Sequence, residues 1–238
     1  IGCLAREANV SVFNSLNVKS SDATFDYWAQ KFSAGAGPGW NGELLSELGN
    51  ENWNVAWPYI LGNRYLRERI APSIRVVDQL GNLSTGAVDQ MGCATAARSL
   101  KMWAIMERYI PRERHKRVFG GQFAAGNGSN GMGGMFAYLD PITGRQAHEL
   151  GDYYAVAPYW GADRDDGLNL ATILRDKLWL AGDQFWIDRC KLCIDKMHPL
   201  LQHNQQFLAR YAPNLKLTFS AGGGWLWGDN LPVQNNPL

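Results

Sequence analysis

The sequence has almost no charge imbalance, since it contains 23 basic and 22 acidic side chains among 238 residues. A protein that binds nucleic acid or an anionic membrane through electrostatics needs a clear excess of positive charge. The short basic run at 112–117 lacks the interleaved aromatic residues of a protein that binds single strands. We therefore expect neither nucleic acid nor a membrane as a partner, and a ligand without net charge.

Long apolar runs and cysteines are also scarce. The chain has no uninterrupted apolar run of the roughly 18 residues that a membrane-spanning helix needs. Four cysteines are too few for a disulfide scaffold in a chain of this length. Cys190 and Cys193 form a CxxC within a helical pattern, but no second CxxC or pair of histidines accompanies them. We expect two thiols on a helix and no metal or other cofactor.

The chain begins at Ile1 and not at a methionine, which indicates a processed protein or a fragment. Three Asn-x-Ser/Thr sequons, at Asn9, Asn82 and Asn127, permit glycosylation in a secreted protein. The resulting expectation is an extracellular or secreted location.

Several nucleophile, phosphate and metal motifs are missing. No G-x-x-x-x-G-K-S/T occurs, which excludes the phosphate loop of an NTPase. No serine stands in a G-x-S-x-G turn, and the four histidines are expected near helix ends or in loops. His198 and His203 are five residues apart, and this spacing is wrong for a helical pair of metal ligands.

One glycine pattern supports a rival function. Gly126, Gly128 and Gly131 spell G-x-G-x-x-G between a predicted strand and a predicted helix, the order of a dinucleotide fingerprint. That fingerprint also needs an acid at the end of the next strand, whereas Asp152 stands at the start of it. We favour a βα loop here, and a dinucleotide-binding oxidoreductase remains an alternative.

Strand and helix patterns alternate along the chain. Strands are predicted at 10–18, 115–125, 152–161 and 214–227. Helices are predicted at 20–34 with Ser21 or Asp22 as N-cap, at 53–70, 94–109 and 135–139, and at 169–211 with interruptions near Gly182 and Pro199. Strands separated by helices predict one α/β domain over 1–238 with a parallel sheet, either a (β/α)8 TIM barrel or a doubly wound sheet.

Residues 43–54, ELLSELGNENWN, fit two local structures. As a helical turn, the leucines end at a Gly49 C-cap. As a strand, Glu47, Gly49 and Glu51 share one face. Glu51 then lies at the carboxyl end of the strand, where the active sites of (β/α)8 barrels are built.

The stretch 47–54, ELGNENWN, resembles the E-[YL]-[SG]-N-E-x-W-N element of glycoside-hydrolase-like (β/α)8 barrel proteins. These are related to the clan of retaining glycosidases in which an Asn-Glu pair closes the fourth strand. The resemblance implies that Glu51 is the general acid/base and that Asn50 binds a sugar hydroxyl. Further stretches resemble the third, fifth, sixth and seventh strands, so the match spans about 4–228. It implies an incomplete barrel that another segment or chain closes.

The chemistry of glycoside cleavage explains these residue types. One carboxylic acid protonates the leaving oxygen, and a second carboxylate attacks or activates water. A mouth lined by Trp53, Tyr159 and Trp160 would favour the protonated form of Glu51 by desolvation. Asn50 can hold a hydroxyl without adding a charge. Four aromatic residues are candidate sugar platforms: Tyr159, Trp160, Trp225 and Trp227.

The expected seventh strand departs from the pattern of the relatives. They carry Tyr-Glu-Gly-Gly, whose Glu is the nucleophile, whereas this chain reads Ser220, Ala221, Gly222, Gly223. Alanine cannot attack carbon. Three explanations stay open: an inactivating substitution, a natural protein that binds glycan without cutting it, or a carboxylate supplied from 163–166. We expect a glycoside-hydrolase-like protein that acts on or binds carbohydrate, with a non-catalytic glycan-binding or structural protein as the alternative.

Overall fold

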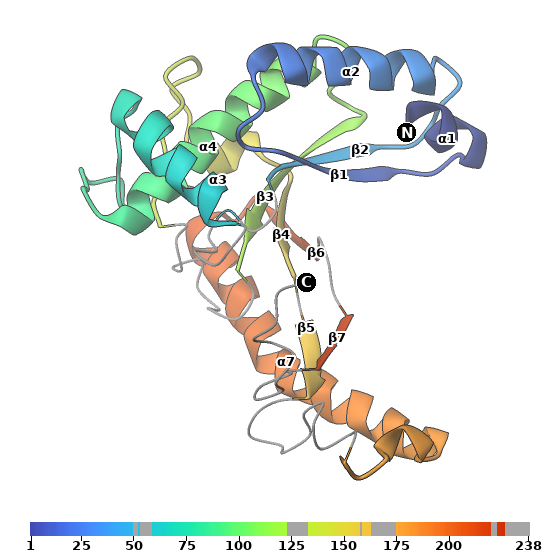
Figure 1. Cartoon of the computed structure of the whole chain (residues 1–238). Helices are drawn as coiled ribbons and strands as arrows, with labels where there is room; N and C mark the ends of the chain where they lie inside the picture. The colour runs from blue at the N-terminus through green and yellow to red at the C-terminus, as the bar shows by residue number, and fades with distance from the viewer. Residues whose placement is uncertain are drawn as a thin grey trace.

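A computed structural model describes residues 1–49, 52, 59–122, 133–157, 159–162, 175–219 and 223–226, with the backbone alone for 159–162, 179, 193, 196 and 223–226. Among these residues, five strands form one parallel sheet: β1 (Val12–Leu16), β2 (Leu44–Leu48), β3 (His115–Gly121), β4 (Tyr153–Val156) and β6 (Lys216–Phe219). A second, two-stranded parallel sheet joins β5 (Tyr159–Ala162) to β7 (Gly223–Leu226) (Figure 1).

The described helices connect the strands. They are α1 (Gly2–Ala8), α2 (Asp22–Ala36), α3 (Ile60–Tyr65), α4 (Ala87–Met106) and α7 (Asp183–Tyr211). Shorter helical turns are η1 (Leu66–Ile70), η2 (Ala71–Ser73), η3 (Ala147–Leu150) and η5 (Leu178–Leu180).

The strand order follows the chain order, β1-β2-β3-β4-β6, and every described pair is parallel. A doubly wound sheet would reverse its order at a switch point, and the described strands show no such reversal. The α/β fold is therefore confirmed, with an order compatible with part of a (β/α)8 barrel. The described strands do not close, because β1 and β6 each have one neighbour in this sheet.

Helices α2 and α4 lie on one face of the sheet (Figure 1). Trp103 of α4 packs edge-on against Phe119 of β3, with ring centroids 4.8 Å apart. Phe119 therefore faces the helices, and alternation along the paired strands places Leu44 and Leu48 on the same side. Leu45 and Glu47 lie on the opposite face.

The structure decides between the two local alternatives for 43–54, because residues 44–48 form a strand and not a helix. Local sequence did not favour either one, and the strand is fixed by its neighbours β1 and β3. The N-cap of α2 is confirmed at Ser21, whose side-chain oxygen accepts a hydrogen bond from the Thr24 backbone amide at 3.1 Å.

Other predicted boundaries are wrong. Residues 135–139 form a turn followed by an isolated bridge from Leu139 to Gln146, and not a helix. Gly134 precedes them with a φ of 79°, which a continuing helix does not allow. Helix α7 continues through Pro199, although it does begin after Gly182. Helix α4 begins at Ala87 and not at the predicted Ala94. Tertiary packing buries Met91 and its neighbours, which precede the apolar pattern from which the start was predicted.

The predicted strands 152–161 and 214–227 are each divided in two. Two residues separate β4 from β5, whereas three residues, 220–222, separate β6 from β7. The register of the parallel ladder is therefore shifted by one residue after this break. Val156 pairs with Phe219, whereas Tyr159 pairs with Gly223. Figure 1 shows β5 and β7 beyond the ends of β4 and β6, beside α7. Such extra residues bend strands and often occur near active sites.

Candidate functional site

The predicted site residues either follow β2 and β6 in the chain or belong to β5 and β7. In a parallel sheet the carboxyl ends of the strands meet at one edge, and in α/β proteins ligands bind there. Asn50 and Glu51 follow β2 in the chain, and 220–222 follow β6. Asn50, Glu51, Ala221 and Trp227 themselves lie outside the described residues, as do Trp53 and the aspartates at 163–166.

The turn after β2 begins at Gly49, whose φ is 67°. Its backbone amide donates to the Leu16 carbonyl of β1 at 2.5 Å. A Cβ at this position would meet Asn52 Oδ1 at 2.3 Å and Val18 Cγ1 at 2.5 Å, so only glycine fits. Strand β2 therefore ends before Glu51. The strand ends at Leu48, so the predicted alternation is described as far as Glu47, and Glu51 lies outside the described residues.

Asn52, the residue after Glu51, is buried and makes two hydrogen bonds. Its side-chain amide donates to the Leu48 carbonyl of β2 at 2.5 Å. Its own carbonyl accepts from Asn63 Nδ2 of α3 at 3.1 Å. Trans peptide geometry keeps the Cα of Glu51 about 3.8 Å from that of Asn52. The Asn50-Glu51 pair is thus tied to the carboxyl end of β2, although its own placement is not described.

Glu47 lies on the sheet face that points away from α2 and α4. Its side chain is buried, and Oε2 accepts a hydrogen bond from Ser15 Oγ of β1 at 3.0 Å. On the other side, a Cβ at Gly120 of β3 would lie 1.9 Å from Glu47 Oε1. The glycine therefore makes room for the carboxylate. Sequence analysis assigned no role to Glu47 or Asn52, because neither the pairing of Ser15 with Glu47 nor the fold of the turn can be read from spacing.

Three candidate sugar platforms belong to the smaller sheet. Tyr159 and Trp160 are in β5, and Trp225 is in β7. The register places Trp160 level with Gly224 and Gly161 level with Trp225. The backbone thus brings these aromatic positions onto neighbouring strands, beyond the break that contains 220–222.

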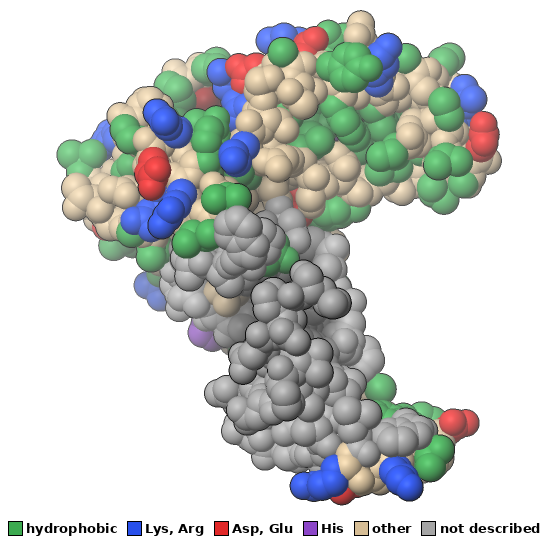
Figure 2. All heavy atoms as spheres, viewed as in Figure 1, with side chains coloured by type: hydrophobic (Ala, Val, Ile, Leu, Met, Phe, Trp, Pro, Cys, Tyr) green, Lys and Arg blue, Asp and Glu red, His purple; other side chains and the backbone are tan. Residues whose placement is uncertain are grey.

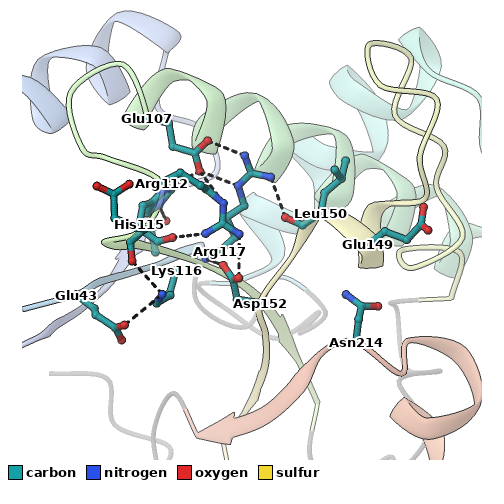
Figure 3. Close-up of polar contacts among 12 residues, drawn as sticks. Glu43, Glu107, Arg112, His115, Lys116, Arg117, Glu149, Leu150, Asp152 and Asn214 are labelled. Carbon is teal, nitrogen blue, oxygen red and sulfur yellow. Dashed lines mark hydrogen bonds and ion pairs between the residues drawn. The ribbon is translucent and has the colours of Figure 1, made fainter.

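A second polar cluster occupies the opposite, amino edge of β3 and β4 (Figure 3). Glu107, just after α4, accepts hydrogen bonds from Arg117 Nε at 2.7 Å and from its terminal nitrogen at 2.6 Å. His115 Nδ1 lies 2.9 Å from the same carboxylate. Burial alone would raise the pKa of Glu107, but the hydrogen bonds from His115 and Arg117 and their charges lower it to about 2.

Ser46, His115 and Glu107 are arranged like the Ser-His-acid triad of a hydrolase. Ser46 Oγ lies 2.5 Å from His115 Nε2, and His115 Nδ1 contacts Glu107. Ser46 and His115 are fully buried, and Trp103 Nε1 donates to the Ser46 carbonyl at 3.1 Å. No substrate can reach this hydroxyl, so the arrangement stabilises the packing of α4 on the sheet. The expectation that all histidines lie near helix ends or in loops is wrong, because His115 opens β3.

Asp152 is not at the end of a strand, where a dinucleotide-binding site needs its ribose-binding acid. Its carboxylate accepts from the Arg117 backbone amide at 2.8 Å and from Arg112 at 2.9 Å. It therefore belongs to the amino edge, as its position before β4 predicts. Gly126, Gly128 and Gly131 lie outside the described residues.

The CxxC lies within α7, where Cys190 is a free thiol. Within the described ranges, no group of three or more His, Cys, Asp or Glu side chains could hold a metal ion. None of the helices that the structure describes is long and apolar enough to cross a membrane. In the view of Figure 2, described cationic and anionic side chains are interspersed over the helices.

Comparison with known proteins gave no match. No protein-family model matches the chain, and neither a curated protein nor a solved structure matches it. The function proposed below therefore rests on the residue pattern and on the geometry of the described strands.

Proposed function

We propose that this chain is a glycoside-hydrolase-like (β/α) barrel protein that binds a carbohydrate at the carboxyl ends of its parallel strands. The observation that carries the proposal is the anchored turn after β2. Gly49 and Asn52, the residues on either side of the Asn50-Glu51 pair in the sequence, are hydrogen-bonded at the carboxyl ends of β1 and β2, where such folds bind ligands. The segment 220–222 follows β6 in the chain.

In this proposal Glu51 is the acid/base, and Asn50 binds the hydroxyl next to the scissile bond. Tyr159, Trp160, Trp225 and Trp227 are the sugar platforms. Ala221 occupies the nucleophile position and supplies no carboxylate. This vacancy favours glycan binding without cleavage as the second candidate function.

Closure of the barrel by another segment or chain is part of the proposal. β1 is an edge strand without proline, lysine or another charged residue, so nothing in its sequence protects it from pairing. α1, which precedes β1, exposes about two thirds of Ile1 and Leu4. A further strand beside β1 would pair the free backbone groups and cover these side chains. A secreted location, proposed from the sequons, is compatible with the exposure of Asn9 and Asn82.

Binding is tested by titrating the purified chain with cellohexaose, xylohexaose, mannohexaose and laminarihexaose in a calorimeter. The proposal expects saturable binding of at least one hexaose and a clear loss of affinity in Asn50→Ala. Absence of binding to all four would contradict it.

Catalysis is tested with aryl glycosides. Ala221→Glu restores a carboxylate, and azide added to the unchanged chain can attack the anomeric carbon while the protonated carboxyl of Glu51 supplies a proton to the leaving aryl oxygen. Release of the phenol in either case, abolished by Glu51→Gln, would support a hydrolase-derived site. If neither Ala221→Glu nor the unchanged chain with azide releases phenol, and hexaose still binds, the result would support the non-catalytic role.

A further inference from the structure

The outer side of β1 offers backbone groups to a further strand. Alternate residues of β1 bond to β2, since the Val12 amide donates to the carbonyl before β2 at 2.8 Å and the Leu16 carbonyl accepts from the amide after it. Backbone groups of successive strand residues point to opposite sides, so those of Phe13 and Ser15 point away from β2. No strand that the structure describes pairs with this side of β1.

Asn14, in the middle of β1, carries an unsatisfied donor. Its Nδ2 atom is buried and has no hydrogen-bond partner within the described part of the chain. An unsatisfied buried donor costs about 1–3 kcal/mol. Asn14 is level with Ser46, so alternation along β2 places it on the sheet face that α2 and α4 cover. A strand that adds to this edge beside Asn14 can supply the missing acceptor.

The sequence of β1 is complementary to itself in the antiparallel direction. β1 reads Val-Phe-Asn-Ser-Leu, with Asn14 at the centre. When two copies pair about a two-fold axis through Asn14, Val12 faces Leu16 of the second copy and Phe13 faces Ser15 of the second copy. The outward backbone groups of Phe13 and Ser15 then exchange hydrogen bonds. Asn14 forms the pair without backbone hydrogen bonds, in which opposite side chains lie closest.

Asn14 also selects this register over its neighbours. If the axis moves to Phe13 or Ser15, Asn14 faces an apolar Val12 or Leu16 of the second copy, which offers no side-chain acceptor. With the axis at Asn14, each carboxamide that turns toward the axis can donate from Nδ2 to Oδ1 of the other copy. A buried asparagine fixes the register of paired helices in the same way.

We propose that β1 is a self-association edge, on which a second copy of this chain pairs antiparallel with Asn14 on the two-fold axis. The pairing joins the two main sheets into one continuous sheet. The contact uses the same residues on both copies, so it closes after two chains. The chain beside β1 is thereby a second copy, and the contact is independent of carbohydrate binding.

The first test measures the molar mass of the full chain by sedimentation equilibrium at increasing concentration. We expect the wild type to reach twice the mass of one chain. Phe13→Pro removes an outward amide and leaves the ladder with β2 intact, so this variant should keep the mass of one chain.

Phe219→Pro is the matched control at the other edge of the sheet. The Lys216 amide of β6 donates to the Asp152 carbonyl before β4, so alternation points the Phe219 amide outward, as in Phe13. This variant should dimerise like the wild type. Thermal unfolding verifies that both proline variants fold.

The second test places a thiol on the axis. Asn14→Cys is made in a Cys3→Ser chain, which lacks the exposed native thiol. The two Cα atoms of such a pair are about 4.5 Å apart, within the range for a disulfide, so mild oxidation should give a covalent dimer on a non-reducing gel. Asn17→Cys is the control. Asn17 faces Ser11 of the second copy, which places the two introduced thiols about 20 Å apart along the strands.

Three results would overturn the inference. One is a wild-type chain that stays monomeric at every concentration, and another is a dimer that persists in folded Phe13→Pro. The third is a failure of Asn14→Cys to crosslink, or crosslinking of Asn17→Cys instead, because the axis would then lie elsewhere. Hexaose binding is measured separately. Its absence would contradict the proposed function and would leave the dimer unaffected.

Discussion

Glu107 and Glu47 are carboxylates at opposite ends of one parallel sheet, and the protein holds them differently. Glu47 is buried, whereas 17% of the Glu107 side chain is exposed. Glu107, at the amino edge, receives hydrogen bonds from Arg117 and His115. Glu47, inclined toward the carboxyl edge, orients the exposed hydroxyl of Ser15 and lies against Gly120. Glu107 therefore links α4 to the amino edge through two basic partners, whereas Glu47 links β1 to β2 nearer the carboxyl edge. Four changes test this contrast.

The largest expected effect is on stability, at the amino edge. Glu107→Ala leaves Arg117 and His115 without their anionic partner. We expect a cost of about 3 kcal/mol, the lower end of the range for a buried pair, because Arg117 and Glu107 are each partly exposed. Urea unfolding should show this loss, whereas Glu113→Ala, an exposed neighbour, should change stability by less than about 0.5 kcal/mol. A Glu107→Ala protein as stable as the wild type would contradict the contrast.

Acid should weaken the same edge. The pKa of Glu107 is about 2 in the folded chain and 4.5 ordinarily, so its stabilising effect is complete above about pH 4.5 and is lost as the pH falls toward 2. The difference corresponds to about 3 kcal/mol. Unfolding free energies between these pH values should fall less steeply in Glu107→Gln. An identical slope in both proteins would argue against the assigned role.

The anchored turn should affect stability and binding together. Asn52→Ala removes the hydrogen bond to Leu48 and leaves the carboxamide-lined space beside Gly49 empty, at a cost of about 1–2 kcal/mol. Because the turn carries Asn50 and Glu51, hexaose affinity should also fall. Loss of stability with unchanged affinity would separate the turn from the proposed site.

The smallest stability effect is expected at Glu47. Glu47→Gln keeps the shape and an oxygen that can accept from Ser15, so the free energy of unfolding should fall by about 1 kcal/mol, less than in Glu107→Ala. Chemical denaturation measures this directly. A loss as large as that of Glu107→Ala would make Glu47 a second structural carboxylate and would remove the distinction between the edges.

The sequence pattern predicts most strands of the sheet but few of the residues at which they begin and end. The five strands of the main sheet fall within predicted or admitted segments, because β-branched and apolar runs fit buried parallel strands. The division of 152–161 into two strands could not be predicted, since it depends on the one-residue shift against 216–226. Likewise, local sequence predicts an interruption at Pro199, because proline cannot donate a helical hydrogen bond, but helix α7 continues through it.

The candidate site shows the same division between local and tertiary information. The Asn50-Glu51 pair stands out in the sequence, and its neighbours confirm that β2 ends directly before it. Ser15 and Glu47 are 32 positions apart, and only strand register brings them together. The same is true of Ser46 and His115, whose contact depends on the register between β2 and β3.

The strand order of the main sheet has a consequence for how the chain is made. Each strand pairs with the one that precedes it, so every new unit emerging from a ribosome finds its docking edge already in place. Each described pairing is with a neighbour in strand order, and this favours stepwise assembly of the sheet. The nascent chain can thus acquire order before β6 is synthesised, one strand at a time.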